Sequence, residues 1–202
     1  VAGDTNGTWD VFVKNVVTGQ TTRISTDSNG SQGTDQSYFP SVSADGTRVA
    51  FISKAPNLVA GDTNGNHDVF VKDLVTGQTT MVSTDSNGSQ GDGFFYFISS
   101  ISADGKRVAF SSNASNLVAG DTNGVYDVFV KDLVTGQTTR ASTDSSGSQG
   151  TDYSDYPSIS ADGTHLVLNS RASNFVAGGT HYNIHAFVND LVGIEVGNPR
   201  AV

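Results

Sequence analysis

The chain has 202 residues, a formal net charge of −9 at pH 7 and no cysteine. Its acidity argues against nucleic acid or an anionic membrane surface as a partner. Without cysteine, neither a disulfide nor a thiolate metal site can form. No apolar run approaches the roughly 20 residues of a membrane-spanning helix, so we expect no membrane insertion.

The acidic residues are almost all aspartates, with Glu195 the only glutamate, and 23 residues are glycine. Asp and Gly favour turns, whereas Glu favours helix interiors. The composition therefore indicates strands joined by tight turns, in a chain of ordinary size for a single all-β domain.

One motif recurs four times and organises the chain. Its third copy reads Val118-Ala-Gly-Asp-Thr-Asn-Gly-Val-Tyr-Asp-Val-Phe-Val-Lys-Asp-Leu133. The copies begin at Val1, Val59, Val118 and, in a degenerate form, Val176, which gives steps of 58, 59 and 58 residues. A fixed step of this size predicts a tandem-repeat architecture. We divide the chain into a partial unit, two full units and a degenerate unit, at residues 1–34, 35–91, 92–150 and 151–202.

Each full unit contains four strand signals. In the first full unit the predicted strands cover residues 39–43, 48–53, 68–72 and 78–83. Glycine-bearing turns, Ala44-Asp45-Gly46 and Asp73-Leu-Val-Thr-Gly77, follow the first and third strands, as in antiparallel hairpins. A long loop joins the second strand to the third. The last strand is β-branched and polar, which suits an outer edge.

Four antiparallel strands per repeat describe one blade of a β-propeller. The predicted fold class is therefore all-β, a propeller of four-stranded antiparallel blades with a 58–59-residue repeat. A β-helix is the structural rival, but its repeats are shorter. Tyr156-Pro-Ser-Ile-Ser-Ala-Asp-Gly163, an apolar strand and the Asp-Val-Phe-Val-Lys-Asp-Leu stretch of the earlier copies together resemble the WD40-like (PD40-type) repeat of TolB-like β-propellers. The resemblance covers the chain to about residue 192 and implies a scaffold, a ligand binder or an accessory domain of an enzyme.

About three and a half blades are present. Residues 8–27 supply only the third and fourth strands of a first blade, and residues 193–196 are at best a substitute for the missing outer strand of the last one. Known propellers close with four to eight blades. We expect a longer parent chain, or self-association, to complete the propeller, because open sheet edges invite pairing.

The long loops are expected to share one face of the propeller, and functional groups generally lie on such loops. Three copies of Asp-Thr-Asn-Gly-x-x-Asp have the same flanks, while the x positions vary and carry Trp9, His67 and Tyr126. The loops between repeats add further aromatic residues. The predicted ligand-binding residues are Trp9, His67, Tyr126, Tyr38, Phe95, Tyr96, Tyr153 and Tyr156. They suit a protein or carbohydrate ligand; the alternative is that these rings plug the space between blades.

The same motif offers oxygen ligands for a hard cation. Ca²⁺ takes roughly six to eight oxygens from carboxylates, amides and carbonyls of a tight loop. The candidate calcium ligands are Asp4, Asn6, Asp10, Asp62, Asn64, Asp68, Asp121, Asn123 and Asp127. The alternative is that Asp and Asn form Asx-turns and cap backbone amides of their own hairpin.

These patterns predict a non-enzymatic extracytoplasmic binding or scaffold module that is secreted, periplasmic or at the cell surface. No nucleophile elbow is present, and a glutamate pair cannot exist with Glu195 alone. Two alternatives stay open. One is the propeller of a polysaccharide lyase or hydrolase, or an accessory propeller of a peptidase. The other is a calcium-stabilised surface or matrix protein.

Overall fold

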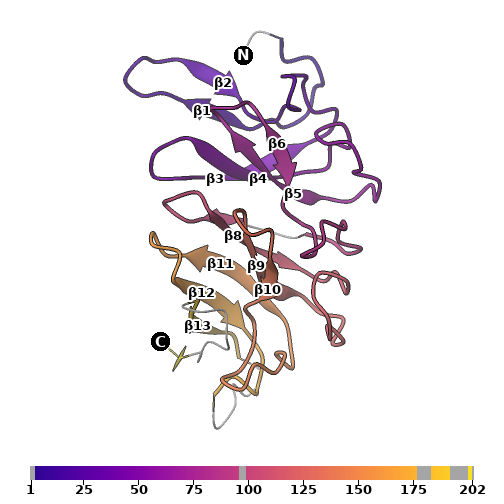
Figure 1. Ribbon diagram of the computed structural model, residues 1–202, viewed down its shortest axis with the longest axis vertical. Helices are drawn as coiled ribbons and strands as arrows, with labels where there is room; N and C mark the ends of the chain where they lie inside the picture. Colours follow the sequence, from indigo (N-terminus) through magenta and orange to yellow (C-terminus); the bar gives the residue numbers. More distant parts are fainter. Residues whose placement is uncertain (1–2, 96–98, 177–182, 192–199, 202) are drawn as a thin grey trace.

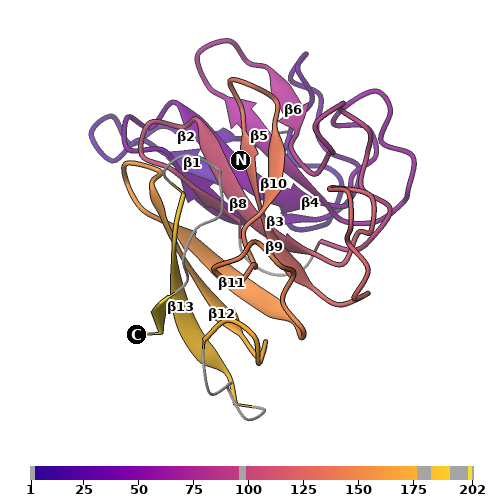
Figure 2. The same cartoon turned by 60° about the horizontal axis from the view of Figure 1, so that its bottom comes forward.

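The computed structural model describes residues 3–95, 99–176, 183–191 and 200–201, and the regular structure in these residues is entirely β-strand. Four antiparallel sheets follow one another along the chain (Figure 1). The first has two strands and each of the others has four, hydrogen-bonded in chain order. In Figure 2 successive sheets are turned relative to one another, as in a propeller.

The first sheet consists of β1 (Phe12–Lys14) and β2 (Thr21–Arg23). The second consists of β3 (Ser37–Val42), β4 (Arg48–Ser53), β5 (Asp68–Asp73) and β6 (Thr79–Met81). The third consists of β7 (Ser100–Ile101), β8 (Arg107–Ser112), β9 (Asp127–Asp132) and β10 (Thr138–Arg140). The fourth consists of β11 (Ser154–Ile159), β12 (His165–Ser170), β13 (His185–Asp190) and β14 (Arg200–Ala201).

This topology confirms the predicted propeller of four-stranded blades, with the first blade incomplete. Among the described residues, β1 pairs with β2 alone, whereas its counterpart β5 is flanked by β4 and β6. The outer strand of the last blade is β14, which pairs with β13. The predicted substitute, residues 193–196, lies outside the described residues.

The core lies between the blades, because side chains of a strand alternate between the two faces of its sheet. In β4, Val49 and Phe51 belong to the cluster shared with the first blade. Their neighbours Ala50 and Ile52 belong to the cluster shared with the third blade. A third cluster joins the third and fourth blades. Each blade is thus buried on the faces that meet its neighbours, which explains the near-continuous apolar runs of the central strands.

A buried lysine links each full blade to the blade before it. Lys131 in β9 is 6% exposed, and its Nζ donates hydrogen bonds to the Thr84 hydroxyl at 2.9 Å and the Asp85 carbonyl at 2.8 Å. It also donates to the hydroxyl of Thr138, its own blade's outer strand, at 3.0 Å. Lys72 in β5 makes the equivalent contacts with the first blade, including the Asp27 carbonyl at 2.7 Å.

An arginine makes the opposite connection, to the following blade. Arg48 in β4 donates from Nη1 to the Gly105 carbonyl at 3.0 Å, and its Nε lies 3.3 Å from Asp73. Arg107 in β8 reaches the Gly163 carbonyl in the same way. Charged groups at both ends of the interface therefore fix the register of blades that apolar packing alone would leave free to slide.

The described part of the first blade shows these positions without the strands that surround them in the second blade. Lys14 occupies the place of Lys72 but is exposed, and among the described residues its ammonium has no hydrogen bond or ion pair. Val16 occupies the place of Leu74 and is 89% exposed. Leu74, by contrast, packs against the core and its amide donates to the Thr47 carbonyl at 2.7 Å.

Lys14 and Lys131 form a matched pair for a stability test. We expect Lys131→Met to lower the free energy of unfolding by about 1–3 kcal/mol, because buried acceptors lose a charged donor. Lys14→Met should change it by less than about 0.5 kcal/mol, as for other exposed positions. Urea unfolding followed by circular dichroism measures both. Equal effects of the two substitutions would contradict a role for the lysine in blade stacking.

Candidate functional site

The long loops are tied together on one face of the propeller. The Asn57 side chain, in the loop between β4 and β5, accepts a hydrogen bond from the Thr34 amide and donates one to the Gln32 carbonyl, each at 2.8 Å. Asn116 makes the corresponding contact with the Gln90 carbonyl at 2.9 Å. The loop inside one blade and the loop leading into it therefore form one surface rather than two independent segments.

Three of the predicted ligand-binding residues meet on this surface. The Tyr38 ring lies 6.3 Å from Trp9 and 5.5 Å from His67, measured between ring centroids. Phe39, which the sequence analysis did not single out, adds a fourth ring 4.9 Å from Tyr38. Trp9 is 71% exposed and Phe39 44%. We call Trp9, Tyr38, Phe39 and His67 the aromatic patch.

The backbone holds Phe39 in an unusual conformation. Its φ is 53°, in the left-handed region that bulky residues seldom adopt, and it precedes Pro40, which itself favours an extended predecessor. Tyr156, before Pro157 in the last blade, repeats this with a φ of 49°. Each lies at an irregularity in the pairing of its strand, where a bulge can redirect a side chain. Such conformations cost about 1–3 kcal/mol and cluster at ligand sites.

The remaining predicted ligand residues lie elsewhere. Phe95, expected on the ligand-facing surface, is instead in the core, 2% exposed and 5.8 Å from Phe110. Its ring fills space between blades because its backbone bridges to Ser112, which buries the side chain. Tyr153 packs under the Arg171 guanidinium at 5.1 Å, and Tyr156 is an exposed residue of β11, at the edge of the last blade. Tyr126 is half-buried, and Tyr96 lies outside the described residues.

Each Asp-x-Asn-Gly-x-x-Asp loop holds a pair of carboxylates bridged by a glutamine. In the second blade, Gln90 Nε2 donates to Asp62 Oδ1 and Asp68 Oδ2, both at 2.9 Å. Ser83 Oγ donates to the other oxygen of Asp68 at 2.6 Å. Gln32 bridges Asp4 and Asp10 in the first blade, and Gln149 bridges Asp121 and Asp127 in the third.

The asparagine of each loop has both ends of its amide engaged. Asn64 Oδ1 accepts from the Asn66 amide at 2.7 Å, and its Nδ2 donates to the Gly91 carbonyl at 3.1 Å. Asn6 and Asn123 make the same two contacts. The contact to the amide two residues further on is that of an Asx-turn. The second aspartate, which this interpretation expected to cap backbone amides of its hairpin, accepts instead from the side chains of Ser83 and Gln90. A calcium ion held between the carboxylates would have to displace the glutamine amide.

The bridging glutamines and serines were not among the predicted site residues. They lie outside the motif, 22 and 15 residues beyond its second aspartate in each of the three copies. That constant spacing was the available signal. Among the described residues, no group of three or more His, Cys, Asp or Glu side chains is arranged to hold a metal ion.

The three carboxylate pairs differ in their counter-charge. Arg23 Nη1 lies 3.4 Å from Asp10 and 3.6 Å from Asp4 in the first blade. Arg140 Nη1 lies 3.7 Å from Asp121 in the third. In the second blade the same position of the outer strand is Met81, which pairs with Phe70 as Arg23 does with Phe12 and Arg140 with Phe129.

The second pair therefore carries uncompensated negative charge. Burial, together with the negative charge of Asp62, raises the pKa of Asp68 to about 6. Burial also raises the pKa of Asp62. In the third blade burial raises the pKa of Asp127, but Arg140 acts in the opposite direction. Of the three carboxylate pairs, only the one in the second blade has no arginine beside it among the described residues.

No protein-family model and no curated protein matches the chain. Several solved structures do. An oligogalacturonate lyase in complex with manganese is 13% identical, with a TM-score of 0.57, and the match covers 97% of this chain and 46% of the lyase. A prolyl endopeptidase is 16% identical, with a TM-score of 0.55, over 94% of this chain and 25% of the peptidase. TolB from Acinetobacter baumannii is 17% identical, with a TM-score of 0.43, over 95% of this chain and 48% of TolB.

The chain spans less than half the length of each of these proteins. Together with the sheet topology, the likeness to the lyase and the peptidase confirms the predicted β-propeller fold, and at these identities it shows the fold alone. In the described part of the chain no helix is long and apolar enough to cross a membrane.

Supplying the missing cation should stabilise the second blade. We expect Met81→Arg to raise the free energy of unfolding by about 1–2 kcal/mol at pH 8, since the new guanidinium pairs with both carboxylates. The pKa of Asp68 is higher in the folded than in the unfolded state, so the folded carboxylate becomes protonated as the pH falls through 6. The gain should therefore shrink between pH 7 and pH 4.5.

Thermal unfolding of the unmodified protein and of Met81→Arg across this pH range measures the effect. Met81→Leu is the control, because it keeps the apolar volume and adds no charge. A gain from Met81→Arg that is independent of pH would contradict this interpretation of the carboxylate pair.

Proposed function

We propose that the chain is a non-enzymatic binding module that works outside the cytoplasm and takes its ligand on the aromatic patch. The observation that carries this proposal is the patch itself, in which two repeats bring four rings together on the long-loop face. Exposed aromatic rings on a rigid frame offer contact area at low cost in conformational entropy. Trp9 is exposed as part of a group of rings rather than singly, and exposed apolar patches mark interaction sites.

The chemistry of the patch favours a ligand with both an apolar face and polar groups. Gln36 Nε2 lies 3.1 Å from His67 Nε2, so hydrogen-bonding groups border the rings. Burial and the nearby Lys54 lower the pKa of His67, while Asp35 opposes them, so the imidazole is neutral at pH 7 and can both donate and accept. A sugar ring or an aromatic-containing peptide meets these requirements.

Trp9 is the only tryptophan in the chain, so its fluorescence reports on the patch directly. We expect neutral oligosaccharides, or peptides containing Phe and Tyr, to shift its emission in a saturable way. Phe39→Ala should weaken binding by about 2 kcal/mol or roughly thirtyfold, as for a central interface aromatic. Val75→Ala is the control, because Val75 is an exposed turn residue outside the patch.

The two probe classes separate a carbohydrate ligand from a protein ligand. Binding that survives Phe39→Ala unchanged would contradict the patch as the site, and the absence of any saturable change with either class would contradict the proposal. Oligogalacturonate with manganese tests the enzyme alternative, since one structural neighbour carries that name. Cleavage of it would replace the binding module by the lyase alternative.

A further inference from the structure

A second site is marked by the position at which the repeats differ in charge. Met81 occupies, in the same strand register, the place of Arg23 and Arg140. In the first blade, Arg23 contacts both carboxylates, and its Nη2 also donates to the Gly3 carbonyl at 2.8 Å. The matching groups of the second blade, Asp62, Asp68 and Gly61, are all in place without a cation.

These groups are buried and incompletely satisfied. Asp68 is fully buried and Asp62 is 8% exposed. Asp62 Oδ2 has no hydrogen-bond partner among the described residues. Asp121 Oδ2 also lacks one, but there the Arg140 guanidinium stands 3.7 Å from the other oxygen of the same carboxylate. In the part of the chain that the structure describes, the second blade offers its pair the neutral amide of Gln90 and no positive charge.

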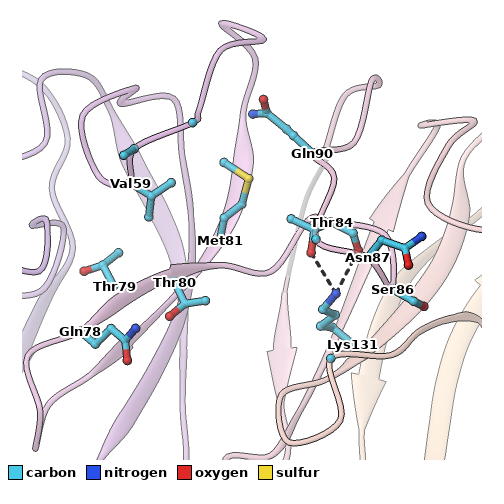
Figure 3. Close-up of a pocket in the computed structure, with 14 residues that line it drawn as sticks. Val59, Gln78, Thr79, Thr80, Met81, Thr84, Ser86, Asn87, Gln90 and Lys131 are labelled. Atoms are coloured by element: carbon cyan, nitrogen blue, oxygen red, sulfur yellow. Dashed lines mark hydrogen bonds between the residues drawn. The ribbon is translucent and has the colours of Figure 1, made fainter.

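A pocket of about 590 Å³ lies between the outer strand of the second blade and the third blade (Figure 3). The two carboxylates do not line it themselves, but Gln90, which bonds both of them, does. Gly61, Met81 and Gln90 line it, so it borders the groups that surround the guanidinium of Arg23 in the first blade. In Figure 3 the amide end of Gln90 points toward the side of the pocket that carries Met81. Met81 is flexible enough to move aside for a ligand.

The opposite wall is polar. Thr84, Ser86 and Asn87 line it (Figure 3). The Thr84 hydroxyl accepts from Lys131, and the Ser86 hydroxyl accepts from the Thr138 amide at 3.0 Å, which leaves the Asn87 amide as a polar group for a peptide main chain. Lys131 also lines it, but its ammonium is committed to Thr84, Asp85 and Thr138. The uncompensated charge beside the pocket is therefore negative, in keeping with the net charge of the chain, −9.

We propose that this pocket binds a guanidinium-bearing ligand, the arginine side chain of a partner polypeptide, and that the guanidinium takes the place in the second blade that Arg23 occupies in the first. The carboxylates of Asp62 and Asp68 and the Gly61 carbonyl accept its hydrogen bonds. The rest of the pocket holds the main chain on either side of the arginine.

The glutamine bridge favours a guanidinium over a metal ion. In the first blade, Gln32 Nε2 keeps its hydrogen bonds to Asp4 and Asp10 at 3.0 and 2.8 Å while Arg23 contacts the same carboxylates. A guanidinium therefore fits with the amide in place. A metal ion needs oxygen ligands where the Gln90 amide nitrogen lies, and Gln90 Oε1 is held away by the Thr63 amide at 3.1 Å. A planar fork of donors also matches paired carboxylates better than an ammonium does.

The test uses N-acetyl-arginine methylamide as the probe and N-acetyl-citrulline methylamide as its uncharged isostere. Isothermal titration calorimetry at pH 8 measures affinity and stoichiometry. We expect one site for the arginine probe and binding at least about tenfold weaker for citrulline, because charge-assisted hydrogen bonds are lost. An arginine-containing hexapeptide should bind more tightly than the single residue, whereas agmatine, a free guanidinium compound, should bind no better than the arginine probe.

Two variants make the test specific. In Met81→Arg the new arginine side chain occupies the site. Because this variant is expected to be more stable than the unmodified protein, a loss of binding cannot be explained by unfolding. Arg140→Met opens the equivalent position in the third blade and should add a second site to the one already present. Circular dichroism confirms that both variants are folded.

Three results would overturn the proposal: equal affinity for arginine and citrulline, unchanged binding to Met81→Arg, or no binding of the arginine probe at millimolar concentration. Stabilisation by Ca²⁺ relative to EDTA, abolished by Met81→Arg and without arginine binding, would assign the pair to a metal ion instead. A failure of arginine binding would not contradict the proposed ligand site on the aromatic patch, because Trp9 and its neighbours lie on the long-loop face and share no residue with this pocket.

Discussion

The blades are held in register by a buried ammonium on the third strand of each full blade. Apolar clusters between the sheets supply most of the stabilisation, but that attraction has no preferred direction. Lys72 and Lys131 give this packing a direction, because each ammonium donates to a main-chain carbonyl of the preceding blade, Asp27 and Asp85 respectively. In the last blade Asn189 stands at this position, and its shorter side chain reaches the Ala141 carbonyl at 2.6 Å.

The bridged carboxylate pairs hold the long loops in a fixed position, as the lysines hold the blades. Asp68 and Asp127 begin the central strands β5 and β9. The serine and glutamine partners of each come from the segment that follows the outer strand of the same blade. The loop is thereby fixed to its own blade at two points. This explains how loops of this length present side chains such as Trp9 in a defined place, and why the acidic residues are aspartates, whose short side chains suit turns.

Sequence reasoning succeeded where the local pattern and the tertiary structure agree. Arg48-Val-Ala-Phe-Ile-Ser53 is an apolar run between a turn and a long loop, and β4 has these bounds. The sequence was less informative where a contact between residues distant in the chain determines the position of a side chain or strand. Phe95 reads as a loop aromatic until its bridge to Ser112 places it in the core. The Thr-Gly-Gln-Thr-Thr stretch that leads into the outer strand of the other copies does not precede β14. Gln90 reads as a loop residue, because only the folded chain brings it between two carboxylates.

Internal repetition makes the remaining differences informative. The residues that hold the blades together, such as the buried lysines, are the same in the two full copies. A difference between the copies is therefore not required by the fold. Trp9, His67 and Tyr126 differ at loop tips, where variation costs the frame little. Met81 is different in kind, since it removes a counter-charge from a buried pair and leaves the pKa of Asp68 raised to about 6. A local conflict of this type in an otherwise consistent structure is characteristic of a site kept for function, where stability is given up for a ligand that restores it.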